Sequence, residues 1–126
     1  MAIKASDFNV DLWNTDLPPV AALLGDEAFF ITRIGDALRK TGKDQGFTER
    51  LVLDQEEPSL ANRLLSELDA LSLFADRTLV ELRLSKTTLD KSIRSALDQW
   101  IQNPPDDKRL LPEETPLHMV HAQVVW

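Results

Sequence analysis

The sequence predicts an α/β fold in which helices cover a mostly parallel sheet, giving three layers. Two observations lead to this prediction. Between residues 20 and 111, short apolar runs typical of strands alternate with longer segments that carry apolar residues at helical spacing. Such alternation favours parallel strands joined by helices. The length of 126 residues is enough for one domain with its own core.

The N-terminal part predicts an irregular region followed by one buried strand. Phe8, Val10 and Leu12 alternate with polar residues, which predicts an edge strand or an extended arm within residues 1–17. The apolar run at residues 20–24 is short and continuous, and it predicts a buried strand.

The first helix is expected to begin at Asp26, an effective N-cap residue, and to stop near Gly42. Its inward face is expected to consist of the apolar residues Phe29, Phe30, Ile34, Ala37 and Leu38. The alternating segment 47–54 predicts the next strand.

A second helix is expected to begin after Ser59 and to end near Ala70. Its apolar face is made of leucines at spacings of three and four: Leu60, Leu64, Leu65, Leu68 and Leu71. Residues 78–84 then predict a strand, because they are apolar at positions 80, 82 and 84.

A third helix is expected to be capped by Ser85 or Thr87 and to stop at the two prolines that follow it. Its inward residues are predicted to be Leu89, Ile93, Leu97, Trp100 and Ile101. A strand is expected at 108–111, where Pro112 would cut it short, and another within 119–125.

The composition excludes several classes of function. Fourteen Lys and Arg against 21 Asp and Glu give a net charge of −7, which disfavours direct DNA binding by this domain alone. The absence of cysteine excludes disulfides and thiolate metal sites. No secretory leader or membrane-spanning run is visible, so a cytoplasmic location is expected, without membrane partners.

No catalytic residues, metal ligands or cofactor are predicted. A phosphate-binding loop needs several glycines and a lysine, whereas the first strand-to-helix turn offers Gly25, Asp26 and Glu27. The acidic pairs and the two histidines are interpreted as ordinary surface groups: Glu56-Glu57, Asp106-Asp107, Glu113-Glu114, His118 and His121.

The connector after the second helix carries two large apolar side chains, Leu73 and Phe74. Connectors usually run over the surface. One interpretation is that both side chains tuck under the connector as part of the core. The other is that they form an exposed plug for a pocket on a partner protein.

The segment Leu71-Ser72-Leu73-Phe74 resembles the bacterial sliding-clamp-binding motif, whose common form is Gln-Leu-Ser/Asp-Leu-Phe; Ala70 stands in place of the glutamine. Its surroundings resemble the N-terminal domain of the delta subunit of the bacterial DNA polymerase III clamp loader. The matching segments are Pro19-Val20, Leu23-Leu24-Gly25-Asp26-Glu27, Asp36-Ala37-Leu38-Arg39, Gln45-Gly46-Phe47, Leu71 through Arg77, Glu81-Leu82-Arg83-Leu84 and Asn103-Pro104-Pro105-Asp106-Asp107.

The resemblance implies an AAA+, P-loop-like domain without a functional phosphate loop, which is not an enzyme by itself. It implies that the domain binds the sliding clamp and helps to open it during DNA replication, while neighbouring subunits handle ATP. Leu73 and Phe74 would insert into the clamp, Leu71 would assist, and Ser72 would shape the loop. Arg77 is expected to support the contact.

The resemblance covers residues 18–111, and residues 112–126 form an atypical tail. The lid and collar domains of the family are not found in this sequence, so assembly with other clamp-loader subunits is less expected than clamp contact. A fragment, a short homologue and a frame-altered product all fit this pattern. Two alternatives stay open: a truncated, inactive remnant of the domain, and a small P-loop-like nucleotide hydrolase.

Overall fold

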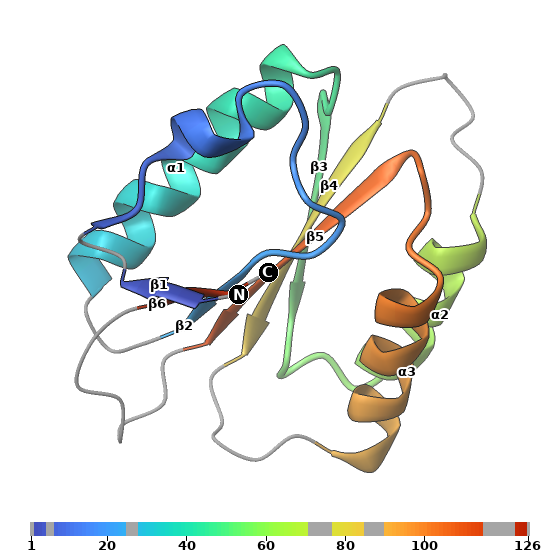
Figure 1. The fold of residues 1–126 in the computed structure, drawn as a ribbon. Helices are drawn as coiled ribbons and strands as arrows, with labels where there is room; N and C mark the ends of the chain where they lie inside the picture. The colour runs from blue at the N-terminus through green and yellow to red at the C-terminus, as the bar shows by residue number, and fades with distance from the viewer. Residues whose placement is uncertain are drawn as a thin grey trace.

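The computed structural model describes residues 2–4, 7–24, 28–70, 77–84, 90–114 and 123–125. Within these ranges the strands form one sheet in the order β1-β6-β2-β5-β4-β3. Strands that are far apart in the sequence are therefore neighbours in the sheet: β5 lies between β2 and β4 (Figure 1).

Four neighbouring strands of the sheet are parallel, which confirms the predicted α/β class. They are β2 (Ala22–Leu24), β5 (Lys108–Glu114), β4 (Thr78–Leu84) and β3 (Glu49–Asp54). At the other end, β6 (Gln123–Val125) pairs antiparallel with both β2 and β1 (Ala2–Lys4). The parallel strands that the patterns at 20–24, 47–54 and 78–84 predict are all present.

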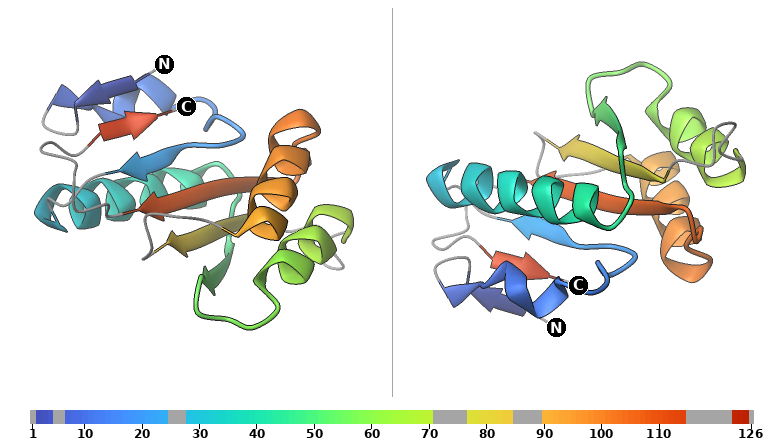
Figure 2. Two further views of the ribbon diagram at one scale, coloured as in Figure 1. Left: turned by 90° about the horizontal axis from the view of Figure 1, so that it is seen from below. Right: turned by 90° about the horizontal axis from the view of Figure 1, so that it is seen from above.

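Helices cover both faces of the sheet and give the predicted three layers (Figures 1 and 2). The helix α1 (Ala28–Asp44) lies on one face together with the short 3-10 helix η2 (Val10–Trp13). The helices α2 (Leu60–Asp69) and α3 (Lys91–Gln102) lie on the other.

Each face of the sheet has its own apolar core, because neighbouring residues in a strand point to opposite faces. In β4, Leu79 packs with the α1 core, and Val80 with the core under α2 and α3. The α1 core also contains Trp13, Leu17, Ala21, Leu23, Ile31, Ile34, Leu38, Phe47 and Leu111. The second core contains Leu53, Leu60, Leu64, Leu82, Leu84, Ile93, Ala96, Trp100 and Leu110.

The edge strand or extended arm predicted within residues 1–17 does not lie at Phe8, Val10 and Leu12, since η2 begins at Val10; the edge strand of this region is β1, at Ala2–Lys4. The Asn9 side chain caps η2 by accepting a hydrogen bond from the Asp11 backbone N–H (3.0 Å). The turn buries Trp13 and leaves Leu12 exposed. The cap at Asn9 and the burial of Trp13 therefore favour a 3-10 helix here, although three alternating apolar residues predicted an extended chain.

The first helix does not stop at Gly42 but continues to Asp44. Gly42 is buried, and a Cβ atom there would lie 3.2 Å from the Leu17 side chain, so the glycine permits close packing. The chain leaves the helix at Gly46, whose φ of 93° favours glycine. Phe29 is exposed, against expectation, because it lies on nearly the opposite side of α1 from Ile31.

The strand predicted to stop before Pro112 continues through it to Glu114. Pro112 lies opposite Leu82 in the register with β4. Asp90 occupies the N-cap position of α3 and Ser59 that of α2, and neither side chain makes a capping hydrogen bond. The predicted caps Asp26, Ser85 and Thr87, and the inward residue Leu89, lie outside the described residues.

No helix in the described ranges is long and apolar enough to cross a membrane.

Trp100 joins α3 to α2 and is expected to be the most costly side chain of this layer to remove. It is fully buried, and its indole N–H donates a hydrogen bond to the Leu64 carbonyl (2.9 Å). Trp100→Ala should lower the free energy of unfolding in urea by about 3–5 kcal/mol.

The adjacent residue is a matched control for this prediction. Ile101 was expected to point inward but is 60% exposed. Ile101→Ala should change the same free energy by less than about 0.5 kcal/mol. Equal losses for the two variants would contradict the packing of α3 described here.

Candidate binding site

The predicted binding residues Leu71, Ser72, Leu73 and Phe74 lie outside the described residues, which stop at Ala70 and resume at Arg77. The structure therefore shows how the two ends of segment 71–76 are held. Ala70 follows the last residue of α2, and Arg77 precedes the first residue of β4.

Lys108 holds the Ala70 end of the segment. Its ammonium donates a hydrogen bond to the Ala70 carbonyl (Nζ to O, 2.5 Å) and lies 3.6 Å from Asp107 Oδ1. The Lys108 side chain is 3% exposed. A lysine is rarely buried this far without partners, so its position depends on these oxygens.

Arg77 is bonded to the domain at the other end. Its guanidinium donates hydrogen bonds to the carbonyls of Gln45 (3.3 Å) and Asp106 (3.0 Å), and it lies over the Phe47 ring at 4.3 Å. Its backbone N–H donates to the Gly46 carbonyl (3.3 Å). Hydrogen bonds from charged donors are stronger than neutral ones, so this end is well fixed.

One turn, residues 106–108, receives both ends of the segment. Lys108 bonds Ala70, Asp106 accepts from Arg77, and the Thr78 N–H donates to the Asp107 carbonyl (2.9 Å). The described residues on either side of the segment, Ala70 and Arg77, are therefore both bonded to the start of β5 and the turn before it. This turn follows α3, and it is part of the sequence that resembles the family.

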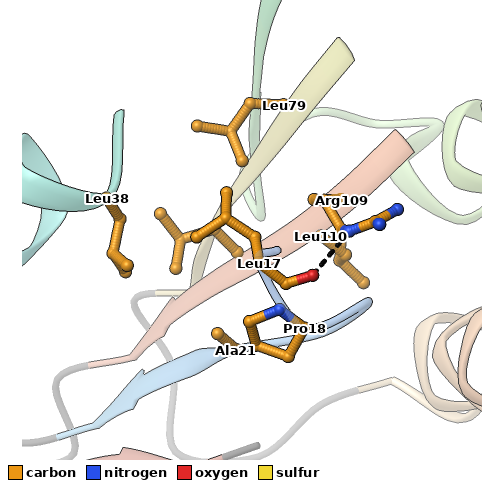
Figure 3. Close-up of a pocket in the computed structure, with 8 residues that line it drawn as sticks. Leu17, Pro18, Ala21, Leu38, Leu79, Arg109 and Leu110 are labelled. Atoms are coloured by element: carbon orange, nitrogen blue, oxygen red, sulfur yellow. Dashed lines mark hydrogen bonds between the residues drawn. The ribbon is translucent and has the colours of Figure 1, made fainter. Parts of the chain in front are cut away.

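Arg109 bonds the same turn, since its Nη1 donates to the carbonyls of Asp106 (3.2 Å) and Lys108 (3.1 Å), and it also reaches residues on the α1 side of the sheet. Its Nε donates to the Leu17 carbonyl (2.9 Å), as Figure 3 shows, and its Nη2 contacts Asp16 Oδ1 (3.1 Å). Its guanidinium also lies 5.0 Å from the centre of the Phe47 ring. The cavity beside Leu17 measures about 10 Å³, which is room for one water molecule and not for a ligand.

An ion cluster centred on one buried carboxylate lies between α1 and the sheet. Glu81 in β4 is 0% exposed and accepts hydrogen bonds from Arg39 (2.7 Å) and Arg50. Arg39 also pairs with Asp36 and lies 4.0 Å from Glu113. The hydrogen bond to Glu81 raises the pKa of Arg50. Every carboxylate of the cluster lies near a guanidinium, so we interpret it as structural.

Elsewhere the described residues offer little for catalysis. None of them form a group of three or more acidic or histidine side chains that could hold a metal ion. A groove of about 200 Å³ runs past the start of α2 and of α3, where Glu57 and Asp90 would repel an anion. The turn Gly25 to Glu27 and both histidines, His118 and His121, fall in undescribed ranges.

The sequence reasoning missed Lys108 and Glu81, although both lie in segments that it singled out. Their charges gave no signal of burial, because their hydrogen-bond partners Ala70, Arg39 and Arg50 lie 31 to 42 positions away. A charged residue inside an otherwise apolar strand is the only available hint, and it does not identify a partner.

Comparisons with known proteins support one family. A family model described as "DNA polymerase III, delta subunit" matches residues 22–115, which include both ends of the segment and the turn that holds them. A search of curated proteins gives no match to the chain.

Glu113 gives the ion cluster a measurable pH dependence. Burial, and then the charge of Glu81, raises the pKa of Glu113 above its ordinary value, although Arg39 opposes the shift. Its carboxylate therefore destabilises the folded state at pH 7, and this penalty disappears as the pH falls below the ordinary pKa. Glu113→Gln should raise the urea midpoint at pH 7, with a gain that fades towards pH 4.

Asp98→Asn, at an exposed position on α3, is the control for this prediction and should leave the midpoint unchanged at both pH values. A lower midpoint for Glu113→Gln at pH 7 would show that the contact with Arg39 outweighs the cost of burial.

Proposed function

This chain belongs to the family of the DNA polymerase III delta subunit, whose place is in the clamp loader of DNA replication, and we propose that it binds the sliding clamp through Leu71, Ser72, Leu73 and Phe74. In this proposal Leu73 and Phe74 enter an apolar pocket on the clamp. Binding weakens the closed ring and helps to open it. The domain acts as a binding module and not as an enzyme.

The observation that carries this proposal is the way the ends of segment 71–76 are held. Lys108 fixes Ala70, and Arg77 is bonded to the carbonyls of Asp106, in the same turn as Lys108, and of Gln45, which follows α1. A rigid frame reduces the entropy that a loop loses when it binds a partner. This arrangement suits a short motif that must be presented in a defined place.

The energetics require more than the two apolar side chains. Burial of one Leu or Phe side chain contributes about 1.5–3 kcal/mol. A micromolar complex needs about 8 kcal/mol after the costs of association. We therefore propose that exposed residues of α2 and Arg77 add contacts. The hydrogen bond from Arg77 to Asp106 lies at an exposed position, where a partner can reach it.

Contacts with other clamp-loader subunits are a second proposal, and it rests on membership of the family alone. Direct binding of DNA is not proposed for a domain of net charge −7.

Calorimetry with a bacterial sliding clamp tests the proposed function. The wild-type chain should show saturable binding. The double substitution Leu73→Ala and Phe74→Ala should weaken it by roughly 100-fold or more, since about 3–6 kcal/mol of apolar burial is removed.

The control for this experiment is the double substitution Leu12→Ala and Ile101→Ala, at two exposed apolar positions. It should leave the affinity unchanged. A wild-type chain that is folded by circular dichroism and does not bind would overturn the proposal and favour an inactive remnant. Equal affinity of the Leu73 and Phe74 variant would assign the contact to another surface.

A further inference from the structure

We propose that two copies of this chain associate through β3, whose strands pair antiparallel and join the two sheets edge to edge. The inference goes beyond the proposed clamp contact, because it rests on the strand Glu49–Asp54 and its neighbours in the structure. β3 is the outermost strand at its end of the sheet, and among the described strands it pairs with β4 alone (Figure 2). The far side of an edge strand offers a row of backbone donors and acceptors to another strand.

The pairing of β3 with β4 determines which of its residues face this free edge. The N–H groups of Glu49 and Gln55 donate to carbonyls near the two ends of β4 (3.1 and 2.9 Å). Neighbouring residues of a strand direct their backbone groups to opposite sides. The residues between them with even numbers, Arg50, Val52 and Asp54, therefore direct theirs away from β4.

The same three residues also share one face of the sheet. They alternate with Leu53, which is fully buried in the core under α2 and α3, so their side chains lie on the α1 side. All three are exposed, and Val52 is 37% exposed although it is apolar. Their order along the strand is a cation, an apolar residue and an anion.

This order fits a second copy that runs antiparallel about Val52. Val52 then lies opposite Val52 of the second copy, and Arg50 lies opposite Asp54 of the second copy on both sides of the symmetry axis. Backbone hydrogen bonds form only where edge-facing residues meet, so the next allowed register is shifted by two residues. That shift places Val52 opposite a charged residue and removes both ion pairs. Charge complementarity therefore selects a second copy and one register.

Arg50 can take part in this pairing while it remains bonded to Glu81. Its Nε and Nη2 donate to the Glu81 carboxylate, and its side chain is 48% exposed. A guanidinium carries five N–H donors, so a second carboxylate can bind beside the first. Asp54 is held at the end of β3, because its carboxylate accepts a hydrogen bond from the Glu56 N–H (2.9 Å) and keeps further acceptor sites.

Sedimentation velocity of the full chain over a range of concentrations tests the association. The wild-type chain should shift from the mass of one chain towards that of two as the concentration rises. Val52→Lys places two ammonium groups opposite each other and should raise the dissociation constant of the dimer at least about tenfold. Asp54→Asn keeps an acceptor for the Glu56 N–H and should raise it about fivefold, because the symmetry removes two ion pairs.

The matched control is Ile101→Lys, the same kind of change at an exposed apolar position of α3. It should leave the dissociation constant of the dimer unchanged. Circular dichroism establishes that each variant is folded. If Val52→Lys does not fold, Asp54→Asn and the cysteine variants below decide the question.

Single cysteines test the register, since the chain has none of its own. In Val52→Cys the two Cα atoms lie about 5.5 Å apart across the pair, which a disulfide can bridge. In Asp54→Cys they lie about 14 Å apart, four residues along the strand, which it cannot. Mild oxidation should therefore give a disulfide-linked dimer of Val52→Cys and not of Asp54→Cys.

The outcomes are distinct. Reversible association that weakens in Val52→Lys and Asp54→Asn, together with cross-linking at position 52, supports the inference. A wild-type chain that keeps the mass of one copy at every concentration overturns it. A dimer that Val52→Lys and Asp54→Asn leave unchanged also overturns it and assigns the contact to another surface. Equal cross-linking of the two cysteine variants overturns the register. The proposed function stands or falls separately, by binding to the clamp.

Discussion

Two adjacent cations at the start of β5 determine how the layers of this domain are joined. Lys108 and Arg109 are both buried, and they point to opposite faces of the sheet because they are neighbours in a strand. Lys108 bonds the end of α2 on one face, and Arg109 bonds Leu17 and Asp16 on the other. Since β5 also pairs with β2 and β4, one strand organises the whole domain.

The ion cluster under α1 complements this arrangement. Apolar contacts alone allow a helix to shift its position on a sheet. A buried carboxylate restricts that position, because it must accept hydrogen bonds from donors placed in a few directions. Glu81 accepts from Arg39 of α1 and from Arg50 of β3, so it ties the helix to two strands. Apolar burial supplies most of the stability of this layer, and the cluster is suited to fixing the register of α1.

The sequence predicted those parts of the fold that depend on local patterns. The strands near 49–54 and 78–84, and the end of the second helix, follow from alternation and leucine spacing. The outward side chains of Phe29 and Ile101 were missed, because an apolar residue at the edge of a helical face can point either way.

The candidate site was predicted only in part. A short motif indicates which segment of the sequence is proposed to bind. Its frame was not predictable, because the contact of Lys108 with Ala70 depends on the order of the strands in space. From the sequence alone, Lys108 cannot be distinguished from an ordinary solvent-exposed lysine. Its burial becomes evident only when the order of the strands is known.

The strand order also governs how the domain can form during synthesis. The neighbours of β2 in the sheet, β5 and β6, are both encoded after residue 107. A nascent chain that has emerged only to α3 carries an unpaired, apolar β2, whereas β3 and β4 can already pair. Because contacts across such long sequence separations form slowly, the incomplete chain exposes a strand edge on the ribosome, where chaperones commonly act.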